Sequence, residues 1–98
     1  MAKATWSAQA KQELKDLITY LKQHNRASAV EASTEIKAIS RLLARRPFIG
    51  RPARSDSERE FSISRWSKVF VYRITPDGID ISTLRDPRMQ PRPDDTEA

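Results

Sequence analysis

The chain contains no cysteine, only two glycines and a single histidine among its 98 residues. The absence of cysteine excludes disulfide bonds and thiolate metal sites. No apolar run has the length that crosses a bilayer, and residues 1–4 lead into polar sequence without a signal-peptide core, so we expect a soluble, cytoplasmic protein. The sequence also lacks the patterns G-x-G-x-x-G and H-E-x-x-H. We therefore expect no cofactor and no metal site.

Basic residues are abundant, and they are concentrated in the middle of the chain. The net charge is +5, and it divides into +2 for residues 1–40, +6 for 41–73 and −3 for 74–98. The basic residues of the middle segment are Arg41, Arg45, Arg46, Arg51, Arg54, Arg59, Arg65, Lys68 and Arg73. Clustered arginine favours an anionic partner, either nucleic acid or an acidic protein segment. The alternative is a basic face that is only solvated.

Two stretches near the N-terminus have the apolar spacing of amphipathic helices. In the first, which covers residues 8–23, the apolar side chains are Leu14, Leu17, Ile18 and Leu21. Ser7 precedes this stretch as a suitable N-cap. In the second stretch, residues 28–45, the corresponding stripe is Ala29, Ala32, Ile36, Ile39 and Leu43. Because the break between the stretches is short, the sequence predicts an antiparallel helical hairpin.

The remaining segments favour strands. Residues 3–6 suit a short edge strand, residues 47–58 suit a loop, and residues 61–63 alternate as a half-buried strand does. Residues 69–72 are apolar on both faces, as in a central strand, and a turn at 75–78 leads to a last strand at 79–84. The sequence predicts one α+β domain over residues 1–86 with the order β-α-α-β-β-β, in which an antiparallel sheet packs against the N-terminal helical hairpin. The Pro-rich, acidic tail, 87–98, is expected to be mobile.

Several short segments, taken in order, resemble those of the RelE/ParE toxin superfamily over residues 4–88. They are "WSAQAKQELKDLITYL", P-x-x-G-R-P at 47–52, R-E-F at 59–61, V-F-V-Y-R-I at 69–74 and D-G-I-D-I at 77–81. The P-x-x-G-R-P and D-G-I-x-I segments are more similar to the ParE-like branch. The resemblance implies a toxin of a type II toxin-antitoxin system. It also implies a hetero-oligomer with a cognate antitoxin whose C-terminal segment covers the hairpin and the sheet.

This superfamily has at least two mechanisms. RelE-like members are endoribonucleases that cut mRNA on the ribosome, and such cleavage needs groups that transfer protons. At the position where many relatives carry histidine, this chain has Arg85, which does not act as a base because its pKa stays above about 12. Two other side chains could in principle transfer protons, but their positions favour structural roles. His24 lies in the break between the helices, far in sequence from the sheet, and Tyr72 lies on the central strand. ParE-like members bind DNA gyrase without catalysis, so we favour a non-enzymatic gyrase poison and keep the endoribonuclease as the alternative.

The resemblance and the charge pattern together assign residues to two surfaces, and no residue is assigned as catalytic. The residues predicted to bind the target are Arg59, Arg73, Arg85 and Arg88. Those predicted to bind the antitoxin are Trp6, Leu17, Trp66 and Tyr72. Two alternatives stay open: Arg85 and Arg88 pair with Asp80 and Asp86 at the surface, and Trp66 folds over the edge of the core. A simple nucleic-acid-binding module is a third possibility, but the sequence has no helix-turn-helix pattern.

Overall fold

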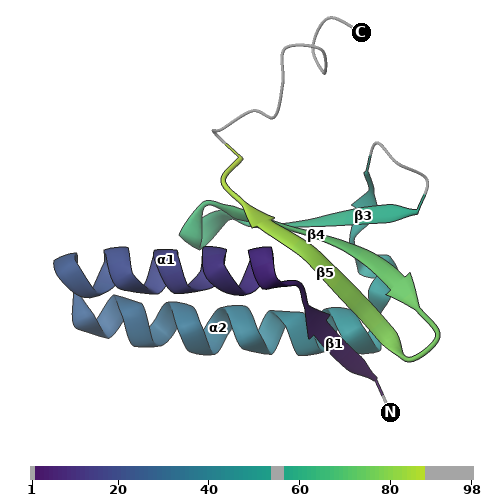
Figure 1. Ribbon diagram of the computed structural model, residues 1–98, viewed down its shortest axis with the longest axis horizontal. Coiled ribbons are helices and arrows are strands. Elements are labelled where there is room, and N and C mark those ends of the chain that lie inside the picture. Colours follow the sequence, from purple (N-terminus) through teal and green to yellow (C-terminus); the bar gives the residue numbers. More distant parts are fainter. Residues whose placement is uncertain (1, 54–56, 88–98) are drawn as a thin grey trace, which may run out of the picture.

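The computed structural model describes residues 2–53 and 57–87. It is a two-layer α+β structure in which a helical hairpin covers one face of a sheet (Figure 1). The elements are β1 (Lys3–Trp6), α1 (Ala8–His24), α2 (Arg26–Arg45), β2 (Arg51–Pro52), β3 (Glu58–Ile63), β4 (Lys68–Thr75) and β5 (Gly78–Arg85). Two 3-10 turns, η1 (Pro47–Ile49) and η2 (Ser64–Trp66), follow α2 and β3. The predicted fold class is confirmed.

Side-chain caps determine where the two helices begin. The Oγ of Ser7 accepts a hydrogen bond from the amide of Ala10 at 3.0 Å, which satisfies a free donor at the start of α1. Asn25 serves both helices, because its amide donates to Leu21 at 2.6 Å and its side chain accepts from Ser28 at 3.2 Å. A break of one residue forces the helices to lie antiparallel, as predicted, although α2 begins two residues earlier than the predicted residue 28.

The five strands are arranged in the order β1-β5-β4-β3-β2. Neighbours from β2 to β5 pair antiparallel, but β1 pairs parallel with β5, with Lys3 opposite Gly78 and Trp6 opposite Ile81. The predicted all-antiparallel arrangement is therefore wrong for this one pair. Parallel neighbours require a long crossover connection, which the two helices and the rest of the sheet provide. The predicted loop at 47–58 also contains η1 and β2.

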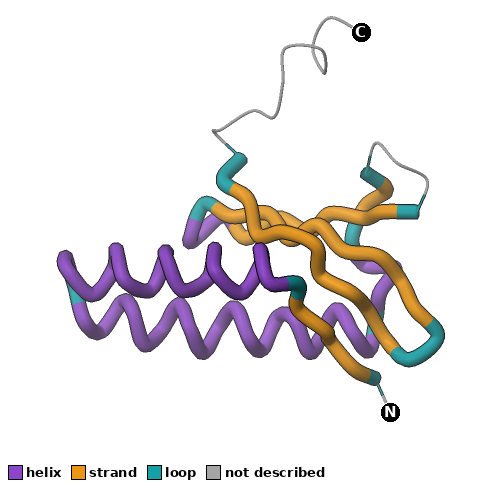
Figure 2. Tube along the Cα trace, in the orientation of Figure 1, coloured by secondary structure: helices purple, strands orange, loops and turns teal. Residues whose placement is uncertain are grey.

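The core lies between the helices and the sheet, as the layers in Figure 2 indicate. Its largest fully buried side chains are Tyr72, Phe70, Ile36, Leu43, Ile79, Ile81 and Leu84. Trp6 packs edge-on against Phe70, with 5.6 Å between the ring centroids. A carboxylate oxygen of Glu13 on α1 accepts from the amide of Leu84 at 2.8 Å and thereby fixes α1 on β5.

Two expectations concern the ends of the chain and the membrane. Within residues 2–53 and 57–87, no helix combines the length and the apolarity that crossing a membrane requires. Of the tail that is predicted to be mobile, only Pro87 is described, and residues 88–98 lie outside the described part of the chain.

Candidate functional site

Three acidic side chains of the two helices form contacts with other parts of the same chain. On α2, Glu31 and Glu35 form ion pairs with Arg65 of η2 at 2.7 and 3.0 Å. On α1, Glu13 accepts hydrogen bonds from β5, including one from Thr83 Oγ1 at 2.7 Å. These contacts turn the acids of both helices toward the sheet and η2. Five basic side chains of the helices line other parts of the hairpin.

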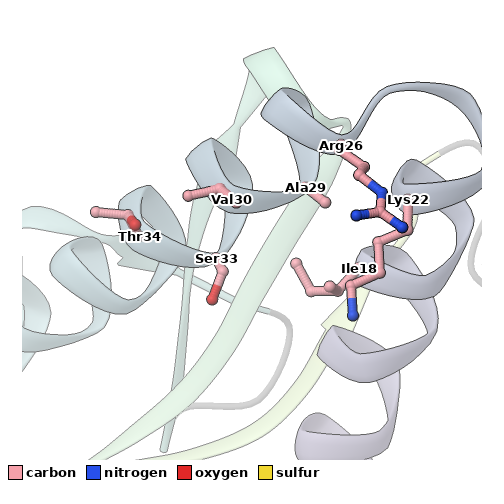
Figure 3. Close-up of a pocket in the computed structure, with 7 residues that line it drawn as sticks. All are labelled: Ile18, Lys22, Arg26, Ala29, Val30, Ser33 and Thr34. Atoms are coloured by element: carbon pink, nitrogen blue, oxygen red, sulfur yellow. The ribbon is translucent and has the colours of Figure 1, made fainter.

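Two basic hollows lie along α1 and α2, and we refer to them together as the furrow. One hollow of about 450 Å³ has Ile18, Ala29 and Val30 as its apolar lining and Lys22 and Arg26 as its charged lining (Figure 3). A second, of about 560 Å³, includes among its lining residues Trp6, Leu14, Lys3, Lys11, Lys37 and Arg41. The α1 residues of both hollows recur at helical spacing and form a single stripe. Among the described residues, no Asp or Glu lines either hollow.

Another hollow, of about 600 Å³, lies between α1 and η2 and brings together the predicted antitoxin contacts Leu17 and Trp66. Its charged lining is mixed, since it contains two aspartates as well as Arg65 and a lysine. The Nε1 of Trp66 donates to Glu35 at 3.1 Å, and Arg65 lies 4.6 Å above the Trp66 ring. Trp66 therefore folds onto the hairpin, and its contact with an antitoxin stays a prediction.

Three of the four arginines that were predicted to bind a target, Arg59, Arg73 and Arg85, lie in the described part of the chain. Arg85 donates to Glu60 at 2.8 Å across β4, and the two side chains are 28% and 17% exposed. Glu60, an acid not considered in the sequence analysis, is thus an ion-pair partner of Arg85. Arg73 is exposed on β4, whereas Arg88 lies outside the described residues. Their roles in binding a target stay predictions.

Tyr72 and Arg59 hold the turn that follows α2. Tyr72 is completely buried, and its hydroxyl donates to the carbonyl oxygen of Pro47 at 2.6 Å. Burial raises the pKa of the Tyr72 phenol, although the neighbouring Arg59 opposes this shift. Arg59 donates to the Gly50 carbonyl through Nε at 3.1 Å and through Nη2 at 2.7 Å. Tyr72 has no exposed area in this structure, and its predicted contact with the antitoxin stays a prediction.

The histidine lies at the tip of the hairpin. The ring of His24 stacks on Tyr20 at 4.4 Å between centroids, and its Nδ1 is 2.8 Å from the Tyr20 carbonyl oxygen. Neither here nor at any other place in the described ranges is a group of three or more His, Asp or Glu side chains arranged to hold a metal ion.

A helical hairpin on one face of a sheet is the arrangement predicted from the resemblance to the RelE/ParE superfamily, and here basic hollows lie along the hairpin. The sequence model of the family described as "ParE toxin of type II toxin-antitoxin system, parDE" matches residues 4–91, so the chain belongs to the ParE toxin family. Among solved structures, "Chromosomal ParDE TA system from P. aeruginosa" has a similar fold, with a TM-score of 0.73 and 20% sequence identity. The match covers 88% of this chain and 96% of that chain. No curated protein sequence matches.

The furrow was not predicted from the sequence, although its signal is present there. Lys11 and Lys22 are separated by about three helical turns, and Lys37 and Arg41 by about one, so each pair shares one face of its helix. The acids at 13 and 16 and at 31 and 35 fall on other faces. Comparing the helical positions of acids and bases would have located the furrow.

Proposed function

We propose that this ParE-family toxin stops growth by binding DNA gyrase and that it acts as a ligand rather than as an enzyme. The observation that carries the proposal is the state of Arg85, which occupies the predicted position of a proton-transfer residue and is paired with Glu60 at 2.8 Å. Tyr72, which was considered for proton transfer as His24 was, is buried, and its raised pKa keeps the phenol neutral. An endoribonuclease would need a group that removes the proton of the RNA 2′-hydroxyl.

Two assays with purified toxin test this assignment. With gyrase, ATP and relaxed plasmid, we expect the toxin to block supercoiling or to accumulate cleaved plasmid, and we expect its antitoxin to reverse the effect. In the second assay, primer extension on translated mRNA reports whether the transcript is cut at codon-defined positions. Normal supercoiling together with such cuts would reverse the assignment in favour of the endoribonuclease.

The same proposal assigns the basic furrow to the antitoxin. Six cations contribute to the lining of the furrow, and its apolar lining includes Val30, which is 67% exposed. An amphipathic helix with an apolar stripe and flanking carboxylates complements both properties, because it removes apolar surface from water and neutralises the cations. The proposed partner is therefore an acidic helical segment of the antitoxin. We expect the association to weaken as the salt concentration rises.

Two charge-reversal variants distinguish antitoxin binding at the furrow from antitoxin binding at the sheet. Lys37→Glu places an acid in the furrow, whereas Arg73→Glu makes the same change on the exposed face of β4. We expect Lys37→Glu to weaken antitoxin binding by about tenfold or more, because like charges then face each other, and Arg73→Glu to leave it unchanged. Calorimetry of each toxin variant with the antitoxin measures the difference. Equal affinities for the two variants would place the antitoxin elsewhere.

A further inference from the structure

Two neighbouring apolar side chains project from the turn that follows α2. Phe48 is 71% exposed and Ile49 is 45% exposed. Single exposed apolar residues are common on protein surfaces and need no explanation. Two consecutive exposed apolar residues in a turn that is held by hydrogen bonds do call for an explanation, because the fold fixes the turn although these side chains add little to the core. We refer to Phe48 and Ile49 together as the apolar knob.

The turn that carries the knob is held by side chains from two strands of the sheet. Tyr72 on β4 donates to Pro47, and Arg59 on β3 donates to Gly50 and, at 3.4 Å, to the carbonyl oxygen of Phe48. Gly50 permits this close approach, because a Cβ there would lie 2.2 Å from the Tyr72 hydroxyl oxygen. The backbone of the turn is therefore held in one conformation, so binding through the knob loses little backbone entropy.

Positive charge flanks the knob in sequence, and one arginine also lies against it in space. Arg45 and Arg46 precede it at the end of α2, and both are exposed. Arg51 follows it with a side chain that is 74% exposed and approaches Glu60 only to 3.7 Å. The guanidinium of Arg59 lies 5.1 Å from the centroid of the Phe48 ring. The surface is thus an apolar contact point with arginines next to it.

We propose that the apolar knob is the contact through which the toxin engages its target protein, by entering an apolar pocket bordered by carboxylates. This inference rests on the proposed function only in assuming a protein target. Charge complementarity requires acids around the pocket, and an aromatic anchor beside arginine is the composition of a binding hot spot. A DNA backbone would match the charge of the arginines, but it would not bury Ile49 against an apolar surface, so the favourable free energy of that burial would be lost.

The antitoxin is a less suitable occupant, because the furrow that suits it has its own cations and apolar lining. The lining residues of the furrow on α2 lie between Arg26 and Arg41. The knob begins only after α2 has ended at Arg45. Two surfaces of different shape, one an elongated hollow and the other a projecting turn, suit two different partners.

The test is a double variant, Phe48→Ser with Ile49→Ser, compared with Val30→Ser in the furrow. All three residues are exposed, so the folded state should tolerate each change, and the melting temperature is measured first. We expect the double variant to bind gyrase holoenzyme at least about tenfold more weakly in surface plasmon resonance, as for loss of a hot-spot anchor. We also expect it to lose growth inhibition at equal expression while it binds the antitoxin as the wild type does. Val30→Ser should weaken antitoxin binding and keep growth inhibition.

The other outcomes overturn either the inference or the gyrase assignment, each in a defined way. Unchanged growth inhibition by the double variant refutes it, and a comparable loss of antitoxin affinity makes the knob part of the antitoxin surface. Loss of binding to a plain DNA duplex, or conversion of a dimer to a monomer in gel filtration, assigns the knob to DNA or to a second copy. If the wild type does not bind gyrase but the double variant loses growth inhibition, the gyrase assignment fails and the knob stands. Arg46→Glu, which keeps both apolar side chains, should weaken target binding if the double variant proves unstable.

Discussion

The hydrogen bond between Tyr72 and Pro47 connects the central strand to the turn that presents the knob, and Tyr72→Phe removes it. The substitution keeps the ring and nearly all of the buried volume, so it leaves no large cavity. It deletes a 2.6 Å bond from a side chain with no exposed area and leaves the Pro47 carbonyl oxygen without this donor. The loss is confined to one polar contact, which makes the expected effect calculable.

The expected destabilisation follows from two contributions. A protein hydrogen bond contributes about 0.5–1.5 kcal/mol net, and a carbonyl left unsatisfied raises the cost toward about 1–3 kcal/mol. Because Pro47 lies near the surface and water reaches part of the turn, we expect the free energy of unfolding to fall by about 1–2 kcal/mol. For a domain of this size, each kcal/mol lowers the melting temperature by about 4–8 °C.

Urea and thermal unfolding at neutral pH measure this change, and Tyr20→Phe is the matched control. Tyr20 is 58% exposed, so the same chemical change there should alter stability by less than about 0.5 kcal/mol. Hydrogen exchange of the Ile49 amide, which donates to Arg46, should accelerate in Tyr72→Phe as the turn loosens. If Tyr72→Phe is as stable as the wild type and its Ile49 amide exchanges at the same rate, Tyr72 does not hold the turn.

Three further expectations concern the same region. The pKa of Tyr72 is raised above the ordinary 10.0 in the folded protein, so the unfolded chain loses the phenol proton at a lower pH. The contribution of the neutral Tyr72 to stability is therefore complete below about pH 10 and is lost as the pH rises through the folded pKa. Alkaline unfolding monitored by circular dichroism should show this loss in the wild type and not in Tyr72→Phe. Gly50→Ala places a methyl group 2.2 Å from the Tyr72 hydroxyl oxygen and should cost about 1–3 kcal/mol, and an unchanged melting temperature would contradict the close packing. Arg85→Met leaves the 17% exposed Glu60 without this partner and should cost about 1 kcal/mol, most of which Glu60→Gln in the same chain should restore.

The helices were predictable because their signals are local. Apolar side chains at Leu14, Leu17 and Leu21 mark one face of α1, and Ser7 marks its beginning, so the predicted and observed bounds differ by one residue at the C-terminal end. The pairing of β1 with β5 has no local signal, because its partners are separated by about the whole domain. A strand pattern predicts that a segment pairs, but it does not predict the direction or identity of the neighbour.

The binding surfaces were only partly predictable, for a different physical reason. Tyr72 has the composition of an interface residue, yet its neighbours in space bury it completely. Phe48 and Ile49 occur in a segment with two prolines and a glycine, which correctly indicates a turn but says nothing about exposure. The rigidity of the turn depends on hydrogen bonds from Arg59 on β3 and Tyr72 on β4. Both residues are distant from the turn in sequence and reach it only through the fold.

The separation of the furrow from the knob leads to a last expectation about neutralisation. On α2 the furrow extends from Arg26 to Arg41, a length of about 22 Å at 1.5 Å per residue, which a helix of about 15 residues fills. Such a helix ends before the turn at Pro47, so it leaves the knob uncovered.

We therefore expect a synthetic peptide limited to the proposed furrow-binding helix of the antitoxin to bind the toxin without relieving the proposed inhibition of gyrase. The full antitoxin should relieve that inhibition, because its additional bulk prevents a large target from reaching the turn. A control peptide whose carboxylates are replaced by amides should not bind, since the furrow cations then lack partners. Full relief by the short acidic peptide would mean that occupying the furrow is sufficient, and that the target contacts the hairpin rather than the turn.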